Sequence, residues 1–365
     1  MDNSQGKIGL KEFLAIILLT VGTKVADNTP KTLYEELGNA AWISIILISL
    51  ITLIPVLLLT KLCSLYPEKN LTDIILHLFG KYLGWLVLFI CWFMQTYALF
   101  YNTAIYSDII KTLYFNNTPY IVISILLITV SAYGAKKGIE SIGSSSWMSL
   151  FLIKITLLFI LAFTFIQGEI NFLFPLLGEG VWVLMEESYY HSSIFTEFIF
   201  LFFIASKVKD NKVLNKGVWI ALIIVTIEFT LALIGYVMLF DFYGIKIIEY
   251  PFHETIRYIQ LGFLTNSELL FYPFWLVSSF IRITFYLYLS ALLFGATFKI
   301  KQFEYIVPTI STIIVFAGLI PESVTYSVVQ LREGFLRTIT PFILVLPVIL
   351  WITAKLKGEF KNGKT

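Results

Sequence analysis

The sequence predicts an all-α membrane protein with about ten transmembrane helices, and three observations lead to this fold class. Of the 365 residues, 58% are hydrophobic and only 14% are charged, whereas soluble domains carry about 25% charged residues. The mean hydropathy is +0.84. The apolar residues come in long unbroken runs, not in the alternation typical of a membrane β-barrel. We therefore expect one polytopic membrane domain over residues 1–365, and not a soluble enzyme, a disordered chain or a collagen-like repeat.

Ten runs are apolar over about the 20 residues that a helix needs to cross a bilayer. The first run is apolar only as far as Val21, and the sixth is short and polar at its start. The third and eighth are longer than a bilayer requires, which predicts that they tilt. The expected spans lie near residues 10–30, 41–61, 82–107, 119–135, 147–167, 191–207, 217–240, 267–298, 304–321 and 338–356.

The distribution of Lys and Arg predicts the orientation, because cytoplasmic loops carry an excess of both. Alternate connections form two sets: the set that includes both termini holds 17 Lys and Arg, and the other holds 7. Both termini are therefore expected in the cytoplasm, as an even number of spans requires. The opposite face is acidic near residues 168–190. Its longest connection contains HETIRYIQ, which we expect to form a short surface helix.

Two spans are interrupted by polar residues, near residues 22–30 and near residues 192–197. They open spans one and six, so they stand at matching positions of two five-helix halves, about 10–167 and 191–356. Paired interruptions of this kind are typical of a transporter binding site. The alternative is that both are ordinary helix ends with polar flanks. No residue identity links the halves, so the predicted repeat rests on spacing.

Four charged residues fall inside expected spans: Lys154, Glu197, Glu228 and Arg282. Each costs about 2.5–3.5 kcal/mol on insertion scales, and such residues are usually functional. One interpretation is structural pairing between helices. The other is that Glu197 and Lys154 line a cavity or an ion path, while Glu228 snorkels to the surface. Arg282 is predicted to face carbonyls or a carboxylate, and Glu197 and Glu228 are the available span acids.

Polar pairs at helical spacing add a second set of candidates. Thr284 and Tyr288 share one face of span eight, and Tyr97 and Tyr101 share one face of span three, because residues at i and i+4 are neighbours on a helix. These side chains lie deep inside long spans, so both packing and ligand contact remain open for them.

The sequence offers no support for an enzyme, a cofactor or a nucleic-acid partner. Its two cysteines and three histidines have no metal-binding spacing. No nucleophile stands beside a base, and no phosphate-binding loop is present. The net charge of +2 carries no indication of nucleic-acid binding.

Several segments resemble the B subunits of spore germinant receptors, the GerAB-type family of spore germination proteins. The opening run has a Gly-containing first span, then a Pro, then a Gly-x-x-A-W-I-S start to span two. The matching segments are VGTKVADNTPKTLYEELGNAAWISIILISL, YPEKNLTDIILHLFGKYLGW, SAYGAKKGIESIG, LFPLLGEG, FTEFIFLFF and YPFHETIRYI. Each match is loose, but their order and spacing cover essentially the whole chain.

The resemblance implies a branch of the amino acid–polyamine–organocation (APC) transporter superfamily, with a LeuT-like five-plus-five inverted repeat and broken helices one and six. It also implies a place in the inner membrane of a bacterial spore. There the chain would join an A subunit and a C lipoprotein subunit and would sense a small nutrient such as an amino acid or a nucleoside. The ligand pocket implied by the resemblance uses Gly22, Tyr97, Ile194, Thr196, Thr284 and Tyr288.

Three residues depart from, or add to, this family pattern. Lys154 resembles the lysine that replaces a sodium ion in proton-coupled members of the superfamily. Lys24 and Asp27 stand where the family is usually apolar, so the outer part of span one is unusually charged.

Two functions follow: a non-enzymatic receptor subunit that triggers germination, or a proton-coupled secondary amino-acid permease that uses Lys154 or Glu197.

Overall fold

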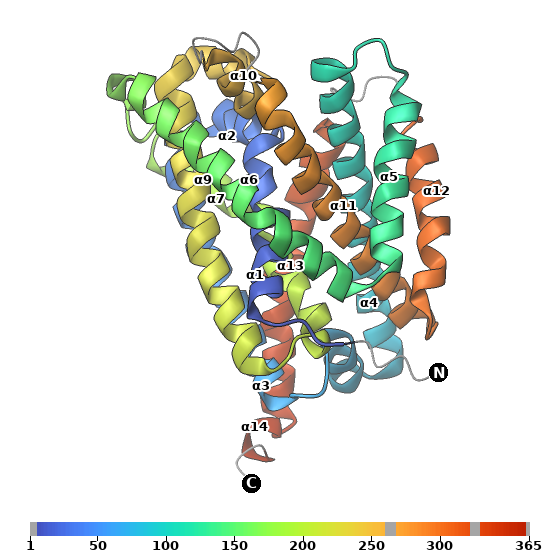
Figure 1. Ribbon diagram of the computed structural model, residues 1–365. Helices are drawn as coiled ribbons and strands as arrows, with labels where there is room; N and C mark the ends of the chain where they lie inside the picture. Colours follow the sequence, from blue (N-terminus) through green and yellow to red (C-terminus); the bar gives the residue numbers. More distant parts are fainter. Residues whose placement is uncertain (1–5, 260–267, 322–328, 363–365) are drawn as a thin grey trace.

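The computed structural model describes residues 6–259, 268–321 and 329–362, and these residues form a bundle of helices (Figure 1). Within the described residues, six helical stretches are long and apolar enough to cross a membrane. They are Thr29–Leu65, Leu71–Tyr114, Ile139–Gln167, Asn211–Ile247, Phe271–Phe298 and Val329–Leu356, and Tyr120–Lys136 and Phe303–Ala317 are shorter apolar helices. The chain is therefore an all-α multi-pass membrane protein, as predicted.

Most expected spans correspond to continuous helices. They are α3 (Ala41–Leu65), α4 (Leu71–Ile109, continued by the π-helical turn η3, Ile110–Tyr114), α5 (Tyr120–Lys136), α6 (Ile139–Gln167), α9 (Asn211–Ile247), α11 (Glu268–Phe298), α12 (Val307–Ala317, preceded by η7, Phe303–Ile306) and α13 (Val329–Leu356). Of these, α3, α4, α6, α9 and α13 extend beyond the apolar windows. The start of α4 shows why the windows were too short. Asn70 and Asp73 form a reciprocal capping box there, and the positive φ of Gly80 bends the polar first part away from the span.

The first expected span is divided into three parts. The helix α1 (Leu10–Thr20) ends where the 3₁₀ segment η1 (Gly22–Ala26) begins. The helix α2 (Thr29–Leu37) then starts with Pro30 in its first turn, where a missing N–H costs nothing. A second 3₁₀ turn, η2 (Gly38–Ala40), leads into α3.

The sixth expected span is interrupted in the same way. The helix α7 (Val181–Tyr190) passes into the 3₁₀ segment η5 (His191–Phe195), which is followed by the short α8 (Glu197–Phe200) and by η6 (Leu201–Lys207). The sequence reading placed residues 168–190 in a connection, and that was wrong for α7. Glu186 and Glu187 break its apolar run, although Leu, Met and Glu are all good helix formers. The preceding connection contains only η4 (Ile170–Leu173).

Most of the HETIRYIQ stretch lies in the helix α10 (Pro251–Tyr258), which exposes Arg257 and Tyr258 on one face and buries the other; Gln260 lies outside the described residues. Phe252, His253 and Ile256 are buried and pack in the region where α10 contacts α9, α11 and η1. Burial, together with the nearby Arg257 guanidinium, lowers the pKa of His253 to about 3. His253 is therefore neutral, and its Nδ1 lies 2.8 Å from the Tyr114 hydroxyl.

Contacts between distant segments bring both ends of the described chain to the same end of the bundle (Figure 1). Ile8 exchanges backbone hydrogen bonds with Lys207 and Lys209, at 2.9 and 3.0 Å. Near the other terminus, the short helix α14 (Glu359–Asn362) places Glu359 3.0 Å from His77 of α4. The predicted common side for both termini therefore agrees with the fold, and the membrane side on which they lie is considered below.

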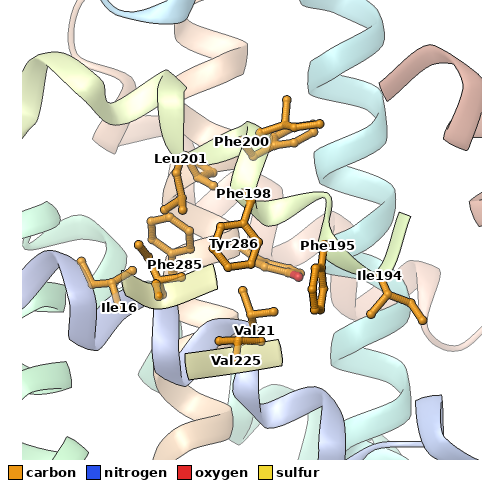
Figure 2. Close-up of a cluster of buried hydrophobic side chains, with 14 of the residues drawn as sticks. Ile16, Val21, Ile194, Phe195, Phe198, Phe200, Leu201, Val225, Phe285 and Tyr286 are labelled. Carbon is orange, nitrogen blue, oxygen red and sulfur yellow. The ribbon is translucent and has the colours of Figure 1, made fainter. Parts of the chain in front are cut away.

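The two interrupted segments cross within a densely packed apolar core (Figure 2). Phe195 and Phe198 stack edge-to-face with ring centroids 5.6 Å apart. They lie among Ile16 of α1, Val225 of α9 and Phe285 of α11. All five side chains are essentially inaccessible. Any charged group placed among them is therefore cut off from water.

Gly178 is expected to be one of the least replaceable residues in the connection before α7. Its φ is +52°, and an added Cβ would collide with the Leu37 carbonyl oxygen and lie 3.2 Å from the Ala40 nitrogen. Gly178→Ala should lower the midpoint of thermal unfolding, because a left-handed residue costs about 1–2 kcal/mol and the collision adds to it. Gly80→Ala is the matched control, since its φ is +75° and its Cβ would meet nothing within 4 Å. Equal midpoints for the two variants would contradict the prediction.

Candidate functional site

The interrupted segments are joined by a buried ion pair between Lys24 of η1 and Glu197 of α8. The Lys24 ammonium lies 2.7 Å from both carboxylate oxygens, and the two side chains are only 4% and 6% exposed. Lys24 also donates a hydrogen bond to the carbonyl oxygen of Ile194. Helix interruptions leave backbone carbonyls without an intrahelical partner, and at membrane depth each must be satisfied by protein. Lys24 does this for Ile194.

Arg282 of α11 lies on the other side of Glu197 and is completely buried. Its guanidinium is 3.8 Å from a Glu197 oxygen and 3.7 Å from an Asp27 oxygen. It donates hydrogen bonds to the hydroxyls of Tyr106 and Tyr286, at 3.0 and 3.4 Å, and Tyr286 in turn donates to Glu197. Of the two acids predicted to face Arg282, Glu197 does so and Glu228 does not. Asp27 was not predicted as a partner.

A third buried cation, Arg332 of α13, completes the cluster. It donates to the side-chain oxygens of Asn28 and Thr29, at 2.7 and 2.5 Å, and lies 5.6 Å from the Tyr101 ring centroid. Lys24 and Arg332 lie outside the apolar runs in the sequence, but both side chains are buried within the bundle. The expected last span began at residue 338, whereas α13 begins at Val329.

A cavity of ≈ 20 Å³ adjoins the Lys24–Glu197 pair. Water needs about 10–15 Å³ by this measure, so the space suits one or two waters and no larger ligand. Tyr97 lies against Phe335 with ring centroids 4.1 Å apart, beside this cavity. The site is therefore closed. The lining includes Lys24, Gln95, Tyr101, Ser193, Thr196 and Phe335.

Lys154 and Glu228 form a separate ion pair on the other side of the first interruption. Their charged atoms are 2.5 Å apart, and the side chains are 17% and 16% exposed. Glu228 therefore pairs between helices instead of snorkelling to the surface. Gly22 faces this pair: an added Cβ would lie 3.0 Å from the Lys154 ammonium. A cavity of ≈ 40 Å³ adjoins the pair and is lined by Gly22, Lys154 and Ser278, among others.

Two of the residues implied as ligand contacts lie away from both charged sites. The Thr284 methyl group faces Gly134 of α5, and the Tyr288 ring packs on Phe303 at 5.5 Å. Helical geometry explains this, since Arg282 and Tyr286, at i and i+4, occupy the face of α11 toward Glu197. The i,i+4 spacing of Arg282 and Tyr286 is the sequence signal that could have identified this face, and the sequence analysis selected Thr284 and Tyr288 instead.

A second polar cluster joins α2, α7, η5 and α13. Arg337 donates to carboxylate oxygens of Glu36 and Glu187, at 2.7 and 2.8 Å, and His191 lies 2.5 Å from Glu36. One oxygen of each acid and one His191 nitrogen lie within 4.8 Å of one another, as metal ligands could. Because the Arg337 cation already bridges both carboxylates, the cluster is an ion-pair network that ties these elements together.

Comparison with known proteins agrees with this architecture. A sequence family described as spore germination protein matches residues 10–326. Spore germination protein KB of Bacillus subtilis (strain 168) is 23% identical over 368 residues, covering 97% of this chain and 96% of that protein. Spore germination protein XB of Bacillus anthracis is 24% identical over 287 residues, covering 76% of this chain and 79% of that protein.

The fold is also that of a solved transporter. Mhp1, a nucleobase-cation-symport-1 family transporter solved in a closed conformation with bromovinylhydantoin bound, aligns with a TM-score of 0.68. The alignment covers 95% of this chain and 78% of Mhp1 at 13% sequence identity, so it shows a shared fold and nothing more. Family and fold are those of receptor- or permease-type membrane proteins. With the family match extending over residues 10–326, the chain belongs to the spore germination proteins of the GerAB type.

Proposed function

We propose that this chain is the B subunit of a nutrient germinant receptor and senses a small nutrient at the site between its two interrupted helices. The observation that carries the proposal is the buried cluster of Lys24, Glu197 and Arg282 at that crossing, in a chain of this family. Charges at membrane depth are rare unless they serve a function. Amino acids are the first ligand class to test, because the resemblance to receptor B subunits implies them.

Sensing requires two conformations with different affinities for the ligand, because a ligand shifts an equilibrium only through that difference. The cavity of ≈ 20 Å³ beside Lys24 is too small for a nutrient, so binding requires a second conformation in which this cavity is larger. Binding would separate the interrupted segments from α13. The ion-pair network of Glu36, Glu187, His191 and Arg337 joins the same elements and would open with them. The A subunit and the C lipoprotein subunit would read the change without catalysis by this chain.

A germination assay tests the proposal directly. Spores with and without this chain would be exposed to a panel of amino acids and nucleosides in the presence of their A and C subunits. Loss of the response to at least one nutrient, with a normal response to a non-nutrient trigger, is the expected result. Unchanged responses across the panel would remove the receptor assignment.

The topology predicted for this role has both termini in the cytoplasm, as the 17-to-7 distribution of Lys and Arg indicates. Cysteines introduced at Glu179 and Lys209 should be labelled from opposite sides of the membrane, the first from outside and the second from inside. The two positions are suitable because Lys209 bonds to the N-terminal Ile8, whereas Glu179 precedes α7. Labelling of both from one side would exclude the topology.

A secondary amino-acid permease is the alternative, and the Lys154–Glu228 pair favours it. The lysine and the carboxylate are partly exposed, lie 2.5 Å apart and stand beside the interrupted first span, and intramembrane charges of this kind mark ion paths in transporters. Uptake of labelled amino acids into vesicles separates the two functions. A permease accumulates the label when a proton gradient is applied, and a sensor does not.

A further inference from the structure

Lys24 occupies the place where a cation is expected at a helix interruption. Unwound backbone carbonyls at such sites coordinate cations, whereas anionic ligand groups turn to helix N-termini. An ammonium has three N–H donors, and Lys24 has three acceptors: the Ile194 carbonyl and both Glu197 oxygens. A ligand ammonium would have to displace this satisfied and buried cation.

Unlike Lys24, the two arginines of the cluster, Arg282 and Arg332, keep N–H donors without a hydrogen-bond partner. Arg282 reaches its nearest carboxylates only at 3.7 and 3.8 Å, which is longer than a hydrogen bond. Arg332 donates only to the neutral side chains of Asn28 and Thr29, and it forms no ion pair within the described part of the chain. The Nε atoms of both arginines are buried without a hydrogen-bond partner, as is the Ser193 hydroxyl beside the cavity.

The charges of the cluster also favour an anion. Lys24, Arg282 and Arg332 contribute three positive charges, and Asp27 and Glu197 contribute two negative ones; all five residues are at most 5% exposed. Asp108, another buried carboxylate, is engaged by the Tyr250 hydroxyl at 2.9 Å.

We propose that the site binds a small carboxylate that has no amino group, such as a 2-hydroxy or 2-keto acid, and that Lys24 supplies the ammonium that an amino acid would bring. The ligand carboxylate would take the free donor of Arg332, which lies 5.6 Å from the Tyr101 ring centroid, and its body would fill the enlarged cavity that Tyr101 and Ser193 line. The inference rests on the proposed function, because it names the ligand class of the same site.

Matched ligand pairs test this with the purified full-length chain in detergent, by calorimetric titration. L-alanine is compared with L-lactate and pyruvate, and L-phenylalanine with L-phenyllactate, so that each pair differs only at the amino group. The hydroxy or keto acid should bind at least about tenfold more tightly in one pair, because a buried ammonium without acceptors is disfavoured. Tighter binding of the amino acid in every pair, or no binding of any hydroxy or keto acid, overturns the proposal.

Variants assign the preference to Lys24. Lys24→Met frees the Ile194 carbonyl and the Glu197 carboxylate to accept hydrogen bonds from a ligand ammonium. The amino acid of the responding pair should then bind more tightly than its hydroxy or keto acid, which reverses the preference. Lys24→Met/Glu197→Gln removes both charges and should not favour the amino acid. Arg332→Gln should weaken binding of every carboxylate. An unchanged ratio in Lys24→Met sinks the assignment. If amino acids bind and hydroxy acids do not, the ligand-class proposal fails but nutrient sensing stands. If the chain binds neither class and spores germinate normally without it, both proposals fail.

Discussion

Glu197→Leu is expected to destabilise the protein more than any other single change in the charged cluster. Among the described residues, Glu197 is the one carboxylate in contact with both Lys24 and Arg282. Its loss leaves three buried cations with Asp27 alone, and an uncompensated buried charge costs about 3–5 kcal/mol. Lys24→Met should cost less, about 1–3 kcal/mol, because Glu197 keeps Arg282 and the Tyr286 hydroxyl. Assembled protein levels and thermal unfolding in detergent measure both effects.

The double variant Lys24→Met/Glu197→Leu provides the decisive comparison. It removes one charge of each sign, so it should recover most of the stability lost in Glu197→Leu. Glu228→Leu is the matched control, since it also deletes one acid of a lysine pair, but there the side chains are 17% and 16% exposed and water can solvate the remaining lysine. Equal losses for Glu197→Leu and Glu228→Leu, or no recovery in the double variant, would contradict the assigned roles.

The fold was predictable because it depends on long apolar runs and on the polar gaps within them. The interruptions near Gly22 and near Thr196 could both be predicted from the sequence, since polar residues at membrane depth leave little alternative to an irregular backbone. The helix α7 could not be predicted from apolar runs and polar gaps. Glu187, one of its two acidic residues, accepts a hydrogen bond from Arg337 of α13, and a pairing across 150 positions leaves no local pattern.

The charged cluster was only half predictable for a related reason. Glu197 and Arg282 stood out because each interrupts an apolar run. Lys24 and Asp27 were recognised as unusual for the family, but they lie beside a polar loop in the sequence, and only the 3₁₀ turn η1 carries them into the bundle. Arg332 falls outside the apolar window of its span. Burial of these three residues follows from tertiary packing, which no local window reports.

Gly22→Leu is expected to abolish the nutrient response while leaving the protein in the membrane. A side chain at this position points at the Lys154–Glu228 pair, since its Cβ would lie 3.0 Å from the ammonium and 3.5 Å from a Glu228 oxygen. Gly22→Ala should have a small effect, because the ammonium is the far end of a flexible side chain and can move slightly. Leucine is larger, so it must push Lys154 away from Glu228 and from the Leu18 carbonyl, now 3.3 Å away.

The background Lys154→Met/Glu228→Gln shows whether Gly22 acts through this pair. If it does, Gly22→Leu should change the nutrient response little further in that background, because the effects of substitutions at residues in contact are not additive. In the native background Gly22→Leu should leave no germination response to the nutrient at any concentration tested, while a non-nutrient trigger still works. A normal nutrient response in Gly22→Leu would mean that the first interruption can be filled without consequence, and the sensing site would then have to lie away from the crossing of the two broken helices.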